Sequence, residues 1–306
     1  MNEPVVSVLM PAFNTEQYIA QAIQSILQQS FTNFELIILN DGSTDGTSRI
    51  IEQFQDQRIR VIHLAENQGL VKARNRLVEE ARGKYIAFLD SDDVAMPGRL
   101  QLQMNFLEKG GADLCGSACH SLYEGNGKTK PSKERYTDAD IRALITISSP
   151  LCNPAVMGKA EIFKRFPYSA GKDYAEDYSL WAQLALAGYR FANLKEKLIT
   201  YRIHDKQTSQ VRNSETNMVF EKSRRDYLSG LGISLQLTPR PIGFSERMLI
   251  ALPFLMQLNQ KIRGISIAAN YEIYARFQYR GNGLLTHFTR LERFLVSMLA
   301  SIRGAI

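Results

Sequence analysis

The sequence is poor in cysteine and contains no long hydrophobic run. Three cysteines in 306 residues exclude a disulfide scaffold of the secreted type and are typical of a reducing compartment. No uninterrupted apolar run approaches the roughly 18 residues that suggest a membrane-spanning helix. The first residues also lack the basic segment and apolar core of a signal peptide. These absences predict a folded, cytoplasmic protein.

The spacing of two cysteines allows a second interpretation. Cys115 and Cys119 lie four residues apart and directly precede His120, which suggests half of a zinc site. A zinc site needs a second pair of ligands at similar spacing, and none follows. We therefore expect buried thiols at these positions.

Glycine-rich phosphate loops are absent as well. The first apolar stretch, residues 5–10, is followed by Pro11-Ala12-Phe13-Asn14. A dinucleotide-binding fold would place G-x-G-x-x-G there, and a P-loop would place G-x-x-x-x-G-K-S/T. These absences argue against a dehydrogenase and a kinase.

Charge is distributed unevenly along the chain. Residues 1–189 carry a net charge of −4, whereas residues 190–306 carry +10. A basic surface attracts nucleic acid, anionic lipid or a phosphorylated substrate, although it can also be an ordinary solvated surface. No recognisable nucleic-acid-binding module accompanies the basic region, so we expect no nucleic-acid partner.

The first 110 residues alternate between strand and helix patterns. Apolar stretches typical of buried strands are separated by segments in which apolar residues recur at helical spacing. This alternation predicts the α/β class, with a mostly parallel sheet flanked by helices. The expected strands are 5–10, 34–39, 59–64 and 85–89, and the expected helices include 19–27 and 70–81. Asn14 or Thr15 is expected to cap the first helix.

The pattern beyond residue 97 is less regular. A helix is expected near 100–107 and another over 178–186, which contains the only tryptophan, Trp181. From about residue 213 onward the pattern is mainly helical. The sequence therefore predicts a domain over 1–212, with halves 1–110 and 111–212, and a basic helical extension over 213–306. The remaining expected strands are 112–123, 153–158, 190–194 and 198–201.

Three carboxylates follow the fourth expected strand, at Asp90, Asp92 and Asp93. Ligands of open α/β sheets bind at the carboxyl ends of strands, and clustered acids repel one another unless a cation or donor groups compensate. Mg²⁺ and Mn²⁺ prefer oxygen ligands, and Mg²⁺ is often held by one or two carboxylates plus substrate phosphates. The motif predicts a metal-diphosphate site; alternatively, it is an acidic turn that caps the next helix.

Several short motifs occur in a fixed order over residues 4–210. They are VSVLMPAFN at 6–14, NDGSTDG at 40–46, NQGL at 67–70, ARN at 73–75, DSDD at 90–93, AEDY at 175–178 and YRIH at 201–204. This ordered set resembles the family 2 glycosyltransferases, inverting sugar transferases with the GT-A fold. The resemblance implies transfer from a nucleotide-sugar, with UDP as the expected nucleotide, to a hydroxyl of a glycan or lipid-linked acceptor in bacterial cell-surface polysaccharide synthesis. Residues 1–110 would then bind the nucleotide and 111–212 the acceptor.

The resemblance implies where the donor binds. Asp41 would accept a hydrogen bond from the nucleobase edge, Arg74 would contact phosphate or a planar group, and Asp90 would approach the ribose. Alternatively, Asp41 caps a helix or turn and Arg74 forms a surface salt bridge. The expected donor-binding residues are Pro11, Ala12, Asn14, Asp41, Asn67, Gly69, Arg74, Asp90 and Ser91.

The resemblance also assigns a metal and a base. Asp92, with Asp93 and His204, would hold Mn²⁺ or Mg²⁺ against the two phosphates of the donor. Asp177 would be the general base that takes the proton of the acceptor hydroxyl, and Glu176 would position the donor or the acceptor.

These residues also have ordinary structural interpretations. A lone histidine such as His204 is more often structural, and acids such as Glu176 and Asp177 favour the first turn of a helix. Trp181 lies in the same expected helix, where core packing is a stronger expectation than stacking on a sugar.

The C-terminal extension contains apolar stretches beside basic residues. Residues 249–255 lie between Arg247 and Lys261, and residues 294–306 follow Arg290 and Arg293. Such helices suit the surface of an anionic membrane, here the inner face of the plasma membrane. Alternatively, they form a helical subdomain packed on the core or on a second copy in a homo-oligomer.

Two other functional classes remain open on the sequence alone. A sugar-nucleotide nucleotidyltransferase would need a glycine-rich, basic loop after the first strand, which is missing. A catalytically inert glycan-binding or assembly module would not need Asp41, Asp92 and Asp177 together.

Overall fold

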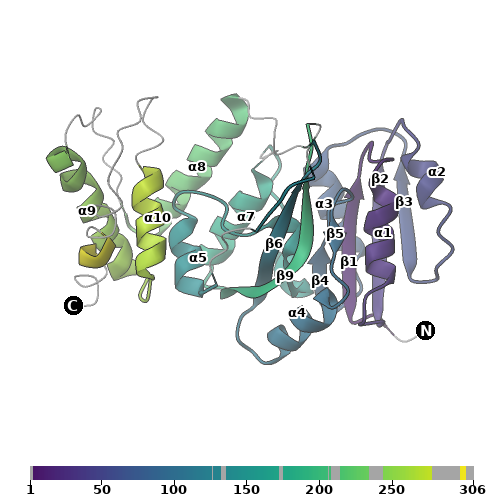
Figure 1. The fold of residues 1–306 in the computed structure, drawn as a ribbon, viewed down its shortest axis with the longest axis horizontal. Helices are drawn as coiled ribbons and strands as arrows, with labels where there is room; N and C mark the ends of the chain where they lie inside the picture. The colour runs from purple at the N-terminus through teal and green to yellow at the C-terminus, as the bar shows by residue number, and fades with distance from the viewer. Residues whose placement is uncertain are drawn as a thin grey trace.

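A computed structural model describes residues 3–125, 127–131, 136–171, 175–205, 207, 214–233, 244–277 and 297–300. Within these residues, nine strands form one sheet in the order β3-β2-β1-β4-β8-β6-β9-β5, with β7 beside β6 (Figure 1). The strands are β1 Val6–Ala12, β2 Phe34–Asp41, β3 Ile59–Leu64, β4 Tyr85–Phe88, β5 Val94–Ala95, β6 Leu114–Tyr123, β7 Thr129–Pro131, β8 Met157–Lys159 and β9 Phe191–Ile203. The predicted α/β class is confirmed.

Helices flank the sheet and extend beyond one end of it. In Figure 1, β3 and α2 lie at one end of the molecule, and α8, α9 and α10 lie at the other. The helices are α1 Ile19–Leu27, α2 Thr47–Ile51, α3 Leu70–Glu80, α4 Arg99–Glu108, α5 Asp138–Leu144, the 3₁₀ helix η1 Asn153–Ala155, α6 Ala160–Arg165, α7 Glu176–Leu186, α8 Ser214–Gly230, α9 Phe244–Lys261 and α10 Ile267–Phe277.

The strands β3, β2, β1 and β4 are all parallel, and helices cover both of their faces. Every residue of β1 and β2 is buried, because a parallel sheet has no solvated face. Side chains of alternate parity enter the two layers: Val8 and Met10 pack with α1 in one core, whereas Leu9 packs with α3 in the other. The parallel strands therefore bring their carboxyl ends to one edge of the sheet.

Beyond β4 the pairing is mixed, and two expectations about strands are wrong. The segment expected as one strand over 153–158 begins as η1, where Pro154 lies inside the 3₁₀ turn, and only then continues as β8, antiparallel to β4 and β6. The two short strands expected over 190–194 and 198–201 are one long strand, β9. It runs parallel to β6 with an irregular register near Ala118.

The expected cap of the first helix is also wrong. The residue that precedes α1 is Tyr18, and no side chain caps this helix. Asn14 has a positive φ of 52°, a conformation that asparagine tolerates better than most residues. Its side-chain oxygen accepts the backbone N–H of Thr44 at 2.8 Å, so it joins two loops instead of capping a helix.

The C-terminal helices pack on α5 through a third core. Phe254 and Leu255, expected on a membrane-facing surface, are buried there against Leu144 of α5 and Leu228 of α8. The Asp140 carboxylate accepts the Ser266 N–H at 2.7 Å, which fixes the start of α10. For these residues the helical-subdomain alternative is therefore supported.

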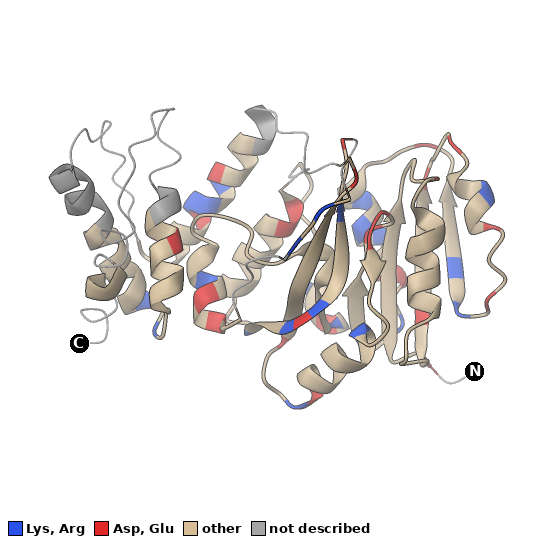
Figure 2. Ribbon diagram, in the orientation of Figure 1, with Lys and Arg blue, Asp and Glu red and all other residues tan. Residues whose placement is uncertain are grey.

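Charge on the described C-terminal helices is mixed. Figure 2 shows both acidic and basic positions on the described part of α8. No helix among the described residues is long and apolar enough to cross a membrane. The expected boundary at residue 212, the side chains of Leu249 and Ile250, and most of the stretch 294–306 lie outside the described part of the chain.

Candidate active site

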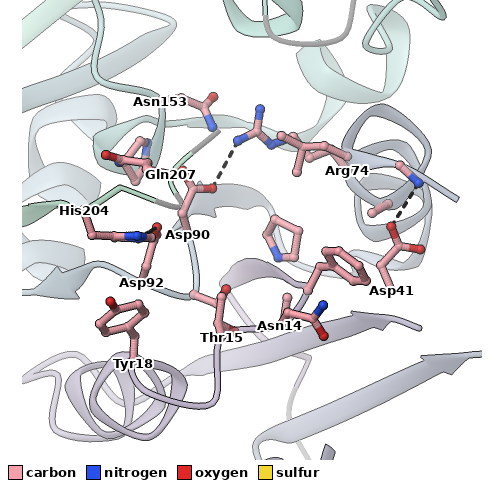
Figure 3. A pocket seen from close by; sticks show the side chains of 18 of the residues that line it. Asn14, Thr15, Tyr18, Asp41, Arg74, Asp90, Asp92, Asn153, His204 and Gln207 are labelled. Atoms are coloured by element: carbon pink, nitrogen blue, oxygen red, sulfur yellow. Dashed lines mark hydrogen bonds and ion pairs between the residues drawn. The ribbon is translucent and has the colours of Figure 1, made fainter. Parts of the chain in front are cut away.

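The carboxyl ends of the parallel strands open into a cavity of about 870 Å³. Loops after β1, β2, β3 and β4 contribute its wall, together with the start of α7 and the end of β9 (Figure 3). Of the residues expected in the site, all but Asp93 line this cavity. These are Pro11, Ala12, Asn14, Asp41, Asn67, Gly69, Arg74, Asp90, Ser91, Asp92, Glu176, Asp177 and His204.

Two loops are fastened to each other at one side of the cavity. The Glu16 carboxylate accepts the Gly46 N–H at 2.7 Å, and the Asp45 carboxylate accepts the Glu16 N–H at 3.1 Å. Burial acts to raise the pKa of Asp45, but hydrogen bonds from Thr47 and Glu16 hold it below its usual value. This reciprocal pairing keeps the loop after β1 against the loop after β2.

Asp41 fixes a third loop. Its two carboxylate oxygens accept the N–H groups of Gln68 and Gly69 at 2.8 and 3.0 Å. Gly42, with φ +66°, lies so close to the backbone of Glu66 that a Cβ atom would be 2.4 Å from its carbonyl carbon. Asp41 therefore holds the backbone of the loop before α3 at the edge of the cavity, which agrees with the turn role given as its alternative, although no side chain caps α3 itself.

The three acids after β4 point in different directions. Asp92 faces the cavity and lies 3.0 Å from His204 Nε2, whose ring is 4.8 Å from the Tyr18 ring. Asp93 is fully buried and accepts the Arg202 N–H at 2.9 Å. Burial and the neighbouring carboxylates raise the pKa of Asp93, and burial and Asp90 raise that of Asp92. Excess negative charge is therefore concentrated at this end of the cavity.

The residues facing this end suit a divalent cation that takes only some of its ligands from the protein and the others from a substrate. Asp92 offers a carboxylate oxygen and His204 an imidazole nitrogen, side by side in the cavity wall. Among the described residues, no group of three or more His, Cys, Asp or Glu residues is arranged to hold a metal by itself. This fits Mg²⁺ or Mn²⁺, which are commonly completed by water and substrate phosphates.

Arg74 connects the two halves of the cavity. Its guanidinium forms ion pairs with Glu176 and, at 3.1 Å, with Asp90 (Figure 3), and it lies 5.6 Å from the centre of the Tyr168 ring. Burial acts to lower the pKa of Arg74, but Asp90 and Glu176 raise it above its usual value. Arg74 is therefore a buried cation joining β4 to α7, not a surface salt bridge.

Asp177 and Glu176 begin α7 and share this environment. The Asp177 carboxylate accepts the Tyr178 N–H at 2.6 Å and lies 3.4 Å from the Ser149 hydroxyl. Burial and the adjacent Glu176 raise the pKa of Asp177 to about 7. A carboxylate with this pKa can take a proton near neutral pH.

Several residues of the site were not among those expected from the sequence. The Tyr18 ring lies tilted against the His204 ring, Arg202 donates to the Asp92 carbonyl at 2.9 Å, and Asn153 and Gln207 line the cavity. Only Arg202 belongs to a recognisable motif. The others reach the site through the fold, since they come from a helix start, a 3₁₀ turn and the segment after β9.

The other candidates behave as ordinary core residues. Cys115 and Cys119 are buried thiols, and burial raises the pKa of Cys115 to about 12. Trp181 is completely buried in the core between the sheet and α7, so it does not face the cavity.

Comparison with known proteins identifies the family. The model described as glycosyl transferase family 2 matches residues 7–166. An uncharacterized glycosyltransferase of Haemophilus influenzae is 33% identical over 77% of this chain and 78% of its own length. The chain belongs to glycosyl transferase family 2. It is therefore an enzyme that transfers a glycosyl group, as the sequence resemblance implies.

Further relatives agree with the fold. A putative teichuronic acid biosynthesis glycosyltransferase of Bacillus subtilis, TuaG, is 32% identical over 66% of this chain and 80% of that protein. The crystal structure of Staphylococcus aureus TarS 1–349 with UDP-GlcNAc matches with a TM-score of 0.62 over 97% of this chain and 90% of that chain, at 17% identity. This likeness confirms the predicted GT-A fold of the family 2 enzyme.

The Arg74 ion pairs should dominate the stability of the cavity wall. We expect Arg74→Met to lower the free energy of unfolding by about 3–5 kcal/mol, because it leaves buried carboxylates without a partner. Equilibrium denaturation at neutral pH measures this loss. The matched control is Arg76→Met on the same helix, where an exposed pair with Glu80 should contribute less than about 1 kcal/mol.

The cause can be isolated with a double variant. Arg74→Met with Glu176→Gln removes the more deeply buried of the two unpaired charges and leaves Asp90, so it should recover part of the stability that Arg74→Met loses. Equal losses for Arg74→Met and Arg76→Met, or fully additive losses in the double variant, would contradict this assignment.

Proposed function

We propose that this enzyme transfers a sugar from a UDP-sugar, with inversion and with the aid of a divalent metal, to a hydroxyl of a glycan or lipid-linked acceptor. One observation carries the proposal. A single cavity holds a carboxylate–imidazole pair, Asp92 and His204, and also the Glu176-Asp177 pair, with Arg74 joining Glu176 to Asp90 between them in the wall. Inverting transfer needs these two functions on opposite sides of one anomeric carbon.

The nucleotide is assigned to the side of the cavity formed by the loops after β1, β2 and β3. Pro11, Ala12, Asn14, Asn67 and Gly69 border this side, and the Asp41 carboxylate offers its remaining lone pairs to a base N–H. TarS crystallised with UDP and with UDP-GlcNAc supports a uridine donor by similarity of fold. Asp90 and Ser91 then face the ribose between the base and the diphosphate.

Asp92 and His204 are the proposed protein ligands of Mn²⁺ or Mg²⁺. When bound, the cation neutralises charge on the departing nucleoside diphosphate. Asp93, expected as a third ligand, is assigned a supporting role instead, because its buried carboxylate accepts the backbone N–H of Arg202. Arg202 in turn donates to the Asp92 carbonyl and stacks 4.8 Å from the Tyr18 ring, which keeps the end of β9 over the site.

Asp177 is the proposed general base. It accepts the proton of the acceptor hydroxyl as that oxygen attacks the anomeric carbon from the face opposite the diphosphate. Glu176 remains paired with Arg74, and burial together with the charge of Glu176 raises the pKa of Asp177 to about 7. The first helical turn of α7 thus contributes both the proton acceptor and the residue that tunes it.

The biological setting is assigned by similarity. The relative named for teichuronic acid biosynthesis supports a role in cell-surface polysaccharide synthesis, where acceptors are glycans or lipid-linked sugars. We retain the division into a catalytic domain over 1–212 and a helical extension over 213–306. The packing of α9 and α10 on α5 joins these two helices of the extension to the catalytic domain.

Metal-dependent donor binding is tested by thermal stabilisation. UDP with Mn²⁺ should raise the melting temperature of the wild-type protein, because a ligand of the folded state stabilises it in proportion to the logarithm of its saturation. Asp92→Ala should abolish the increment due to Mn²⁺. Glu79→Ala, which removes an exposed acid outside the cavity, is the control and should respond like wild type. An Mn²⁺ increment that persists in Asp92→Ala would rule out this ligand.

The base assignment is tested by rate and pH. Asp177→Asn should leave UDP binding nearly intact and lower turnover by about 10²–10⁴-fold. The wild-type rate should rise as the pH passes through about 7, because only the ionised carboxylate accepts a proton. The variant should lose this rise. Turnover equal to wild type in Asp177→Asn would contradict the assignment of Asp177 as the general base.

A further inference from the structure

Buried polar atoms without partners gather in the wall of the cavity. Four of them belong to side chains that are at least nine-tenths buried and that line the cavity. They are Arg74 Nε, Asn153 Nδ2, Glu176 Oε2 and Gln207 Oε1. Buried polar groups in folded proteins nearly always have a hydrogen-bond partner, so this concentration indicates a polar ligand that supplies the missing partners.

Asn153 is the member that the proposed chemistry does not yet use. It opens the 3₁₀ turn η1, which places it directly before Pro154, and its side chain is 6% exposed. Tyr168 donates its hydroxyl to Asn153 Oδ1 at 3.4 Å. The Tyr168 hydroxyl engages only the oxygen of the amide, so Nδ2 is left without a partner in the cavity wall.

The same tyrosine places Asn153 beside the ion pairs. The Tyr168 ring lies 5.6 Å from the Arg74 guanidinium, and Figure 3 shows the Asn153 amide next to Arg74 and Asp90. The Tyr168 backbone N–H is held by Asn75 Oδ1 at 2.8 Å, so the ring has a fixed position. The amide is therefore held rigidly on the wall that also carries Glu176.

We propose that Asn153 is a specificity-determining residue whose amide donates a hydrogen bond to a hydroxyl of the transferred sugar, with Glu176 Oε2 accepting one from the same ring. The assignment rests on the proposed function, which places the sugar between the diphosphate at Asp92 and the base Asp177. Sugar hydroxyls both donate and accept hydrogen bonds, and the wall offers a free amide N–H beside a free carboxylate oxygen.

The test separates recognition of the sugar from recognition of the nucleotide. Dissociation constants for UDP, UDP-glucose, UDP-galactose, UDP-N-acetylglucosamine and UDP-N-acetylgalactosamine are measured by calorimetry with Mn²⁺. The variants are Asn153→Ala, Asn153→Ser and Asn193→Ala. In Asn153→Ser the side chain keeps a hydroxyl near Tyr168 but is too short to reach the sugar. This variant carries the test if Asn153→Ala does not fold. Asn193 is an equally buried asparagine that does not line the cavity.

We expect UDP affinity to stay at the wild-type value in every variant. Affinity for the preferred UDP-sugar should fall about three- to tenfold in both Asn153 variants, as the loss of one hydrogen bond predicts, and should not fall in Asn193→Ala. The differences in dissociation constant among the four UDP-sugars should also become smaller in the Asn153 variants. An unchanged ratio of UDP-sugar to UDP affinity would overturn the role of Asn153 alone. Failure of wild type to bind any of these nucleotides would instead overturn the proposed function, and this assignment with it.

Discussion

The guanidinium of Arg74 holds the two halves of the cavity together. It comes from α3, beside the parallel strands, and its ion pairs reach Asp90 after β4 and Glu176 at the start of α7. A buried cation is costly to desolvate and is retained only where carboxylates compensate it. Two carboxylates do so here, one from each half. The position of α7, and with it that of Asp177, follows from this contact.

The charge of the site is balanced only in part by the protein. Seven carboxylates line the cavity against one guanidinium and one imidazole. They are Glu16, Asp41, Asp45, Asp90, Asp92, Glu176 and Asp177. The physical result is visible in the raised pKa of Asp92 and of Asp177. Burial and repulsion among acids thus concentrate negative charge at one end of the cavity and give the other end a carboxyl that titrates near neutral pH, as the proposed metal site and general base require.

The sequence patterns predicted the parallel strands and the clustering of acids, because both follow from local periodicity and from the topology of α/β sheets. The strand 59–64 and the start of the acidic motif fall where expected. The orientation of each acidic side chain could not be predicted, since adjacent residues such as Asp92 and Asp93 point in different directions once a strand ends. Asn153 and Tyr18 are ordinary in sequence and reach the site only through tertiary packing. The cap expected at Asn14 failed because a loop 30 residues away competes for its side chain.

The most direct measurement is the configuration of the sugar released when the enzyme hydrolyses its donor slowly in the absence of acceptor. With Mn²⁺ and an α-linked UDP-sugar, proton NMR distinguishes the first-formed anomer before mutarotation. A base placed across the anomeric carbon from the diphosphate predicts that the β-anomer appears first, and that Asp177→Asn slows its formation. Release of the α-anomer first would contradict inversion, and with it the arrangement of Asp92 and Asp177 on opposite sides of the reacting carbon.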